Sequence, residues 1–229
     1  MTAPAESASD RDPASDPASG PPVFDAAFRH DLDGLLRWRR DVRHFRTDPV
    51  DPDRLARCLD SFALAPSVGL SQPWRIVSVE TPSARKAALE NFQSANHEAL
   101  QGYTGDRARL YADLKLSGMR EAPHQLAIFC DEATERGHGL GAQTMPEMRR
   151  YSVVAAITQF WLVARAEGVG VGWVSVLDPA RLCADLDVPE SWTLVGYLCV
   201  GLPALDSQTP ELAEKGWETR SPRPEIQTR

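Results

Sequence analysis

The sequence predicts an α+β fold in one sizeable domain. Helical periodicity alternates with short apolar runs, but helices stand before, between and after about four strands, which gives no regular βαβ repeat. A chain of 229 residues can bury a real core, and its 42% hydrophobic and 25% charged residues are typical of a soluble globular protein. We expect residues 23–229 to form a single domain.

Composition also excludes several classes of protein. Residues 1–22 consist mainly of Ala, Ser, Asp and Pro, which predicts a disordered tail rather than a secretory signal. The net charge of −7 argues against general nucleic-acid binding, and no apolar run reaches the roughly 18 residues of a membrane span. Four widely spaced cysteines without a Cys-x-x-Cys motif indicate free thiols in a reducing, cytoplasmic compartment: Cys58, Cys130, Cys183 and Cys199.

Several stretches have the apolar spacing of helices. Asp51 followed by Pro52 is a typical helix start, and residues 146–167 are apolar on more than one side, which predicts a central, buried helix. The expected helices cover residues 24–40, 52–65, 83–100, 106–120, 146–167 and 179–186.

The expected strands are shorter. Residues 125–130 form a continuous apolar run, as in a buried strand, and the glycines between 168 and 172 are expected to end the long helix before the next strand. The expected strands cover residues 75–80, 125–130, 173–177 and 193–200.

Two segments carry the chemistry. Residues 39–45 (RRDVRHF) place three arginines around Asp41, and guanidinium forks match phosphate oxygens two at a time. The alternative is a solvated basic patch at a helix C-terminus. Residues 65–74 (APSVGLSQPW) join a helix to a strand and offer backbone donors and hydroxyls in a loop. Together the segments indicate a site for flavin mononucleotide (FMN).

With residues 168–175 (GVGVGWVS), these segments resemble, in order and spacing, the FMN-binding segments of the nitroreductase superfamily over roughly residues 31–202. The resemblance implies an α/β sandwich whose central, mostly antiparallel sheet is flanked by helices. It also implies a homodimer with each FMN between the chains, where one chain supplies the arginine cluster and the other the loop at Ser67.

Longer strings resemble one branch of that superfamily, the flavin destructases. They are residues 38–43 (WRRDVR), 111–123 (YADLKLSGMREAP), 144–153 (TMPEMRRYSV) and 172–179 (GWVSVLDP). The branch implies an enzyme that uses O2 to fragment reduced FMN (FMNH2) to 5,6-dimethylbenzimidazole, the lower ligand of vitamin B12, with loss of a four-carbon sugar phosphate. FMN would then be the substrate, supplied reduced, for example by a flavin reductase. The alternatives are an NAD(P)H-dependent nitroreductase or flavin reductase, and a non-catalytic flavin-binding protein.

The resemblance assigns flavin contacts to a defined set of residues. Asp41 is interpreted as a base at the ribityl carbon next to the ring, or else as an ion-pair partner of its arginines. Ser175 is expected near flavin N5, or else as a strand serine bonded to backbone. Leu70 stands where many flavin reductases have Asn. The flavin-binding set is Arg39, Arg40, Asp41, Val42, Arg43, Ser67, Val68, Gly69, Leu70, Trp173 and Ser175.

Two further expectations concern the surroundings. Residues 95–120, which include Tyr103, Tyr111, Leu114, Leu116 and Met119, are expected to form a helical lid over the flavin, or else an ordinary helical hairpin covering the core. The histidines show no metal-ligand spacing, so no metal is expected. Trp74 and Gln72 are expected to fix the loop, with Trp74 in the core.

Overall fold

The structure is a computed structural model that describes residues 21–113 and 118–229. The expected disordered tail lies almost wholly outside the described residues. The chain divides into two compact units, one up to Gly34 and one from Leu35 to Arg229. In the first unit, Asp25 accepts a hydrogen bond from the backbone N–H of Phe28, and the Phe24 and Phe28 rings lie 4.6 Å apart. Helix α1 spans Ala26–Trp38, close to its expected range.

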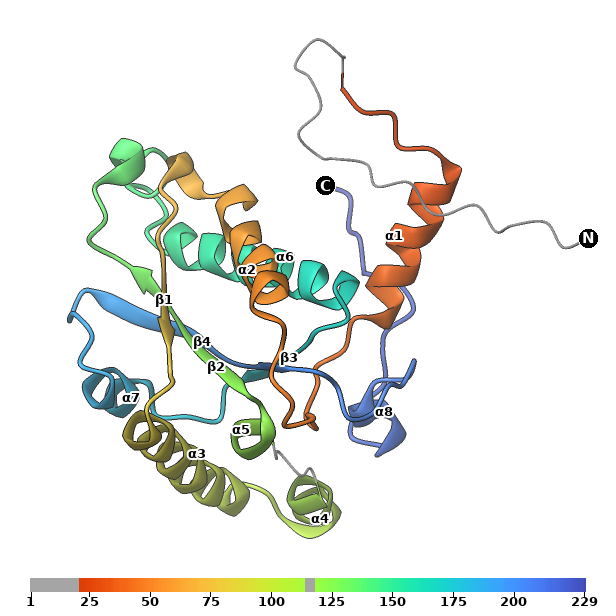
Figure 1. The fold of residues 1–229 in the computed structure, drawn as a ribbon, viewed down its shortest axis with the longest axis vertical. Coiled ribbons are helices and arrows are strands. Elements are labelled where there is room, and N and C mark those ends of the chain that lie inside the picture. The colour runs from red at the N-terminus through yellow and green to blue at the C-terminus, as the bar shows by residue number, and fades with distance from the viewer. Residues whose placement is uncertain (1–20, 114–117) are drawn as a thin grey trace, which may run out of the picture. The chain divides into compact units, whose positions relative to one another are not determined.

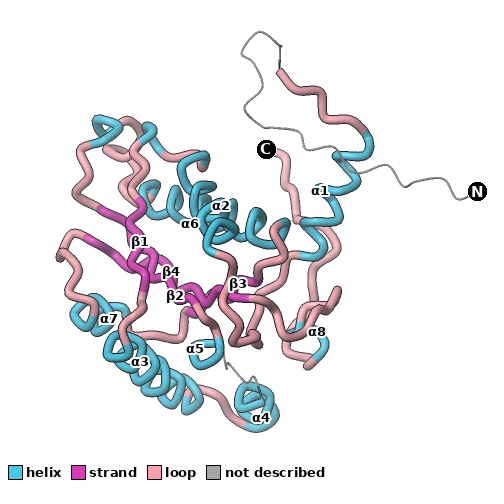
Figure 2. The backbone as a smooth tube through the Cα atoms, viewed as in Figure 1, coloured by secondary structure: helices cyan, strands magenta, loops and turns pink. Residues whose placement is uncertain are grey.

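A four-stranded antiparallel sheet forms the centre of the second unit (Figures 1 and 2). The strand order is β1-β2-β4-β3, and every pair is antiparallel. The sheet confirms the expected α+β class. Its strands are β1 (Trp74–Ser78), β2 (His124–Asp131), β3 (Gly170–Val174) and β4 (Trp192–Gly201).

One face of the sheet is covered by α2 (Pro52–Asp60) and the long helix α6 (Met148–Ala166). Asp51 caps α2 by accepting the N–H of Arg54, and the chain continues as a 3-10 turn, η1 (Ser61–Leu64). The buried side chains of α6 recur at helical spacing and enter one apolar cluster with β2, β3 and β4: Val153, Ala156, Ile157, Phe160 and Ala164. Burial on this scale confirms the central helix.

The other face is covered by α3 (Pro82–Gln101), α5 (Gly118–Glu121) and α7 (Pro179–Asp185), as Figure 1 shows. A second apolar cluster fills this side, with Phe92, Leu182 and Tyr197 among its members. Helix α4 (Gly105–Asp113) follows α3. The expected helix over 106–120 is therefore seen as α4 and α5, and its residues 114–117, including Leu114 and Leu116, lie outside the described part. Short helical turns complete the unit: η2 (Val68–Leu70), η3 (Arg136–Gly139) and α8 (Glu211–Glu214).

The third strand lies earlier than expected. Residues 173–177 were the expected range, but β3 covers Gly170–Val174, so the glycines belong to the strand. The reason is a close approach by another segment, because a Cβ at Gly172 would lie 2.1 Å from the carbonyl oxygen of Val42. Gly170 and Gly172 therefore provide space rather than a helix stop, and only Gly168, at φ +72° after the C-cap residue of α6, is in the left-handed region. No helix in the described part is long and apolar enough to cross a membrane.

Candidate active site

The sequence had suggested that the arginine-rich segment forms the end of a helix, but the structure places it after the helix. Helix α1 stops at Trp38, and the following residues run extended along the edge of β3. The backbone N–H of Val42 donates to the carbonyl of Val171 at 3.0 Å, and Asp41 forms a parallel bridge with Val171. Sheet pairing therefore fixes the backbone that carries the arginines.

The far end of this segment is held by β4 and by α5. The N–H of Arg46 donates to the carbonyl of Leu202 at 2.8 Å, beyond the end of β4. The carboxylate of Glu121 in α5 accepts the N–H of Phe45 at 3.0 Å. Because most of α5 belongs to the region expected to cover the flavin, Glu121 connects that region to the arginine segment.

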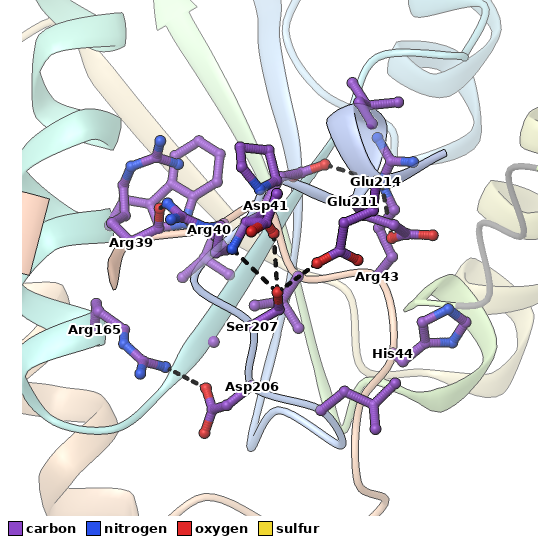
Figure 3. A pocket seen from close by; sticks show the side chains of 18 of the residues that line it. Arg39, Arg40, Asp41, Arg43, His44, Arg165, Asp206, Ser207, Glu211 and Glu214 are labelled. Atoms are coloured by element: carbon purple, nitrogen blue, oxygen red, sulfur yellow. Dashed lines mark hydrogen bonds and ion pairs between the residues drawn. The ribbon is translucent and has the colours of Figure 1, made fainter. Parts of the chain in front are cut away.

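A cationic cavity of about 460 Å³ opens beside the segment. Figure 3 shows Arg39, Arg40 and Arg43 around it with Arg165 of α6, while residues after β4 form another wall. That wall includes three acidic side chains but also Lys215 and Arg220. These C-terminal residues form no motif, and their one signal in the sequence is a scatter of basic residues after the last strand.

Arginine charges in this cavity repel one another, although Arg43 and Arg165 are also paired with acidic side chains. Burial lowers the pKa of Arg39, and the nearby Arg220 lowers it further. The pKa of Arg40 falls by burial and by the charges of Arg220, Arg39 and Arg165. The buried Nε of Arg40 also finds no acceptor within the part of the chain described. A bound anion would relieve this repulsion, so the residues fit a phosphate group.

Two of these arginines also make contacts within the protein. Arg39 lies over the ring of Trp161 with 4.7 Å between its Cζ and the ring centroid. Arg40 donates to the backbone carbonyls of Arg39 and Gln208, and the second bond ties the C-terminal segment to the cluster. These contacts orient the guanidinium groups before any ligand arrives.

Asp41 stands between this cavity and a second one, since it lines both. Its Oδ1 accepts the N–H of Trp173 at 2.9 Å, and its Oδ2 lies 3.3 Å from Nε of Arg43. Burial raises the pKa of the Asp41 carboxyl, and the bond from Trp173 and the charge of Arg43 offset only part of that rise. The side chain nevertheless stays 38% exposed, because it faces the cavities. The expected ion pair with an arginine is present, and the carboxylate is also placed to accept a proton.

The second cavity, of about 320 Å³, is mostly apolar. Ser175 lines it but lies one residue beyond β3, so it is not the strand serine that the sequence had suggested. Trp173 lies against Gly196, where a Cβ would come within 2.7 Å of the indole nitrogen. Further lining comes from α4, α5, β4 and the C-terminal segment: Tyr111, Gly118, Met119, Cys199, Leu212 and Trp217.

Buried groups support the floor of this second cavity. Gln125, 1% exposed, accepts the hydroxyl of Tyr197 at 2.5 Å and donates to the carbonyl of Met119 at 2.8 Å. This satisfied network fixes α5 below the cavity. Burial raises the pKa of the Cys199 thiol to about 12, so the sulfur facing the cavity is a neutral thiol at pH 7. All four cysteines are free, as expected.

The loop at Ser67 lines neither cavity. Ser67 accepts the N–H of Gln72 at 3.0 Å, and the N–H of Val68 donates to the hydroxyl of Ser152 at 3.0 Å. Gly69, at φ +57°, packs against the backbone of Gly137 in η3. Gln72 and Trp74 take up the roles expected of them: Gln72 is held by Arg136, and Trp74 packs against the core. Leu70 is 75% exposed.

Comparison with known proteins agrees with this geometry. The family model described as "Nitroreductase family" matches residues 36–202, so the chain belongs to the nitroreductase family. It is 55% identical to a 5,6-dimethylbenzimidazole synthase of Rhodospirillum rubrum over 205 residues, which cover 90% of this chain and 97% of that protein. It is 45% identical to a 5,6-dimethylbenzimidazole synthase of Rhodobacter capsulatus, over 87% of this chain and 96% of that protein.

Solved structures confirm the fold. Iodotyrosine deiodinase bound to FMN and 3-iodo-L-tyrosine superimposes with a TM-score of 0.67 at 21% identity, over 86% of this chain and 97% of that one. A nitroreductase from Exiguobacterium sibiricum in complex with FMN gives a TM-score of 0.60 at 16% identity, over 84% and 93%. The expected family, its branch and the enzymatic character of the chain are thereby confirmed.

Proposed function

We propose that this protein uses O2 to fragment FMNH2 to 5,6-dimethylbenzimidazole, with release of a four-carbon sugar phosphate. The observation that carries the proposal is the position of Asp41, a carboxyl of raised pKa where a cationic and an apolar cavity meet. The relatives named for this synthesis, at 45% and 55% identity over most of the chain, support the same reaction.

The cationic cavity takes the phosphate end of FMN. Arg39, Arg40 and Arg43 from the edge of β3 are joined there by Arg165 and Arg220, and a phosphate carrying nearly two negative charges offsets their mutual repulsion. The ribityl chain then passes Val42 and Asp41, which line both cavities.

The apolar cavity takes the ring, beside Trp173 and Ser175. FMNH2 and O2 supply the redox chemistry when bound, and the chain supplies position, exclusion of water and proton transfer. Asp41 removes a proton at the ribityl carbon next to the ring, the one sugar carbon that stays behind when four carbons leave with the phosphate. A raised carboxyl pKa makes Asp41 a better base than an ordinary carboxylate. Ser175 offers its hydroxyl close to N5.

The loop of Ser67, Val68, Gly69 and Leu70 completes a site in a second copy of the chain. Its backbone is fixed within its own chain, yet it lines neither cavity there. Exposed apolar side chains near it on η1, the η3 region and α6 provide a surface for that second copy: Leu64, Leu70, Leu140, Met145, Tyr151 and Val154. The functional unit in this proposal is a homodimer with FMN between the chains.

The test is to mix the purified full-length protein with chemically reduced FMN and air, without NAD(P)H, and to measure 5,6-dimethylbenzimidazole by mass spectrometry. We expect product from the wild-type protein and none from a protein-free control. Quantitative recovery of intact FMN would overturn the proposal and favour a flavin-binding protein. In a parallel assay of the protein alone with NAD(P)H and oxidised FMN, oxidation of NAD(P)H without formation of 5,6-dimethylbenzimidazole would favour a reductase instead. If the reaction needs a reductase as the source of FMNH2, adding one with NAD(P)H replaces the chemical reductant.

A further inference from the structure

One wall of the apolar cavity is held by a cluster of aromatic side chains. The Tyr103 and Tyr111 rings stack with centroids 4.9 Å apart, and Trp217 meets them at 5.5 and 6.3 Å. Arg107 lies over the Trp217 ring at 5.1 Å. The cluster joins the α3–α4 connection and helix α4 to the C-terminal segment, which is more than a hundred residues away in sequence.

Hydrogen bonds fix the same contact. Nη1 of Arg107 donates to the carbonyl of Trp217 at 2.6 Å, and the hydroxyl of Tyr111 donates to Asn96 in α3 at 2.9 Å. Gly216, at φ +71°, makes the turn after α8 that precedes Trp217. Trp217 is therefore held both through the face of its ring and through its backbone carbonyl.

Two members of the cluster face the cavity and two do not. Tyr111 and Trp217 line it, whereas Tyr103 and Arg107 contact them from outside. The segment that carries Trp217 also reaches the cationic cavity, because Leu212 lines both cavities and Arg220 lines the cationic one. One short segment thus contacts the spaces proposed for the phosphate and for the ring.

We propose that Tyr103, Arg107, Tyr111 and Trp217 form a clasp that holds one wall of the apolar cavity in place, and that the clasp decides whether bound FMNH2 is fragmented or only reoxidised. The inference rests on the proposed function. Reoxidation is the competing reaction, in which FMNH2 gives two electrons and two protons to O2 to yield FMN and H2O2. An open cavity lets water and flavin exchange, so reoxidised FMN leaves intact.

The test uses the two members that lie outside the cavity. Tyr103→Leu removes the stacked ring, and Arg107→Gln removes the cation over Trp217. Arg109→Gln is the matched control, because Arg109 lies on the same helix, is exposed and pairs only with Asp106 among the contacts described. Each full-length variant receives one equivalent of FMNH2 in air, and 5,6-dimethylbenzimidazole, intact FMN and H2O2 are all quantified.

We expect Tyr103→Leu and Arg107→Gln each to raise the ratio of FMN plus H2O2 to product by about threefold, the order of one exposed cation–π contact. Arg109→Gln should match the wild type, and affinity for oxidised FMN should change little, since the phosphate contacts remain. Trp217→Phe, which keeps an aromatic ring, should retain more product than Trp217→Ala. Thermal melting confirms that each variant is folded.

An unchanged ratio in folded Tyr103→Leu, Arg107→Gln and Trp217→Ala would overturn the clasp. The same result in Arg109→Gln as in Arg107→Gln would assign the effect to charge on α4 and also overturn it. If the wild-type protein forms no 5,6-dimethylbenzimidazole at all, the proposed function fails, and that outcome is distinct from an unaltered ratio among active variants.

Discussion

The arginine segment and the Ser67 loop are both expected to contact flavin, yet they are placed very differently. Residues 39–46 pair with β3 and with the end of β4, and their side chains line two cavities of the same chain. The Ser67 loop is equally well fixed but lines neither cavity, and Leu70 within it is 75% exposed. The difference agrees with the proposed homodimer, in which one chain would hold the phosphate-binding and catalytic part of a site and the loop would serve another copy.

The largest effect should come from Asp41→Asn, which tests the catalytic half of this comparison. The amide keeps an oxygen that can accept the N–H of Trp173 but is not a base. Product formation should fall by roughly 10²-fold or more, the low end for general acid–base catalysis. Affinity for FMN should hold or improve, because a negative charge near the phosphate is removed. A wild-type rate in single-turnover product assays would reduce Asp41 to an ion-pair partner of Arg43.

Complementation tests the division of the site between copies. Asp41→Asn and Ser67→Glu should each have little activity as homodimers. If the site is shared, a mixed dimer has one doubly damaged site and one intact site, so an equal mixture that exchanges subunits should recover about one quarter of wild-type activity. A site built within one chain would leave the mixture as inactive as its components, because each chain then carries one lesion.

Arg39→Ala should weaken FMN binding by more than about 1.5 kcal/mol, the low end for a charge-assisted hydrogen bond. Arg43→Ala should do the same, and both losses should be smaller for riboflavin, which lacks the phosphate. Arg46→Ala is the control, since Arg46 belongs to the same segment, is 57% exposed and pairs with Asp48 outside both cavities. Equal losses for FMN and riboflavin in a fluorescence titration would show that these arginines do not bind the phosphate.

Ser175→Gly tests whether the hydroxyl in the apolar cavity contributes to the reaction rate or to FMN binding. Removing one hydroxyl near the ring should lower the rate of product formation by about fivefold, corresponding to roughly one hydrogen bond, while FMN remains bound. The readout is the single-turnover rate measured beside the FMN dissociation constant. Parallel losses in rate and affinity would instead make Ser175 a binding residue.

The smallest effect concerns pH. The pKa of Asp41 is raised above its ordinary value of 3.8 by burial, so its base form is lost at higher pH than for an exposed carboxyl. Product formation should fall as pH drops through this raised pKa, and Asp41→Asn should lack that acid limb. Because the folded state favours the protonated carboxyl, the stability that protonated Asp41 contributes is complete only below the unfolded pKa and is lost as pH rises through the folded pKa. Melting temperatures should therefore favour Asp41→Asn at neutral pH and converge with the wild type in acid.

Most of the fold could be predicted from local pattern. Helix α2 begins at the expected Asp51–Pro52 boundary, and β2 matches the apolar run at 125–130 to within a residue. The misplaced β3 depended on a contact with residues more than a hundred positions away, where Val42 approaches Gly172. Glycine has the same local signature whether it ends a helix or makes room for another segment, so local reasoning could not separate the two.

The candidate site was predictable only in part. The arginines, Asp41 and Ser175, whose residue types and family resemblance both predict a flavin site, do line the two cavities. The C-terminal wall was missed, since Lys215, Trp217 and Arg220 occupy a polar stretch without periodicity. Tertiary contacts place that stretch: the Ala204 N–H donates to His44, and Glu211 lies 3.9 Å from Arg43.

The bare backbone at Gly172 has a consequence for mutational tolerance. The carbonyl of Val42 occupies the volume that any side chain at position 172 would need, with only 2.1 Å to the first carbon. Every other amino acid would push the 41–43 segment outward and carry the Asp41 carboxylate away from the N–H of Trp173. Because glycine has no side chain, β3 and the segment that carries Asp41 can lie this close together. A saturation library at position 172 should therefore yield glycine as the single functional residue.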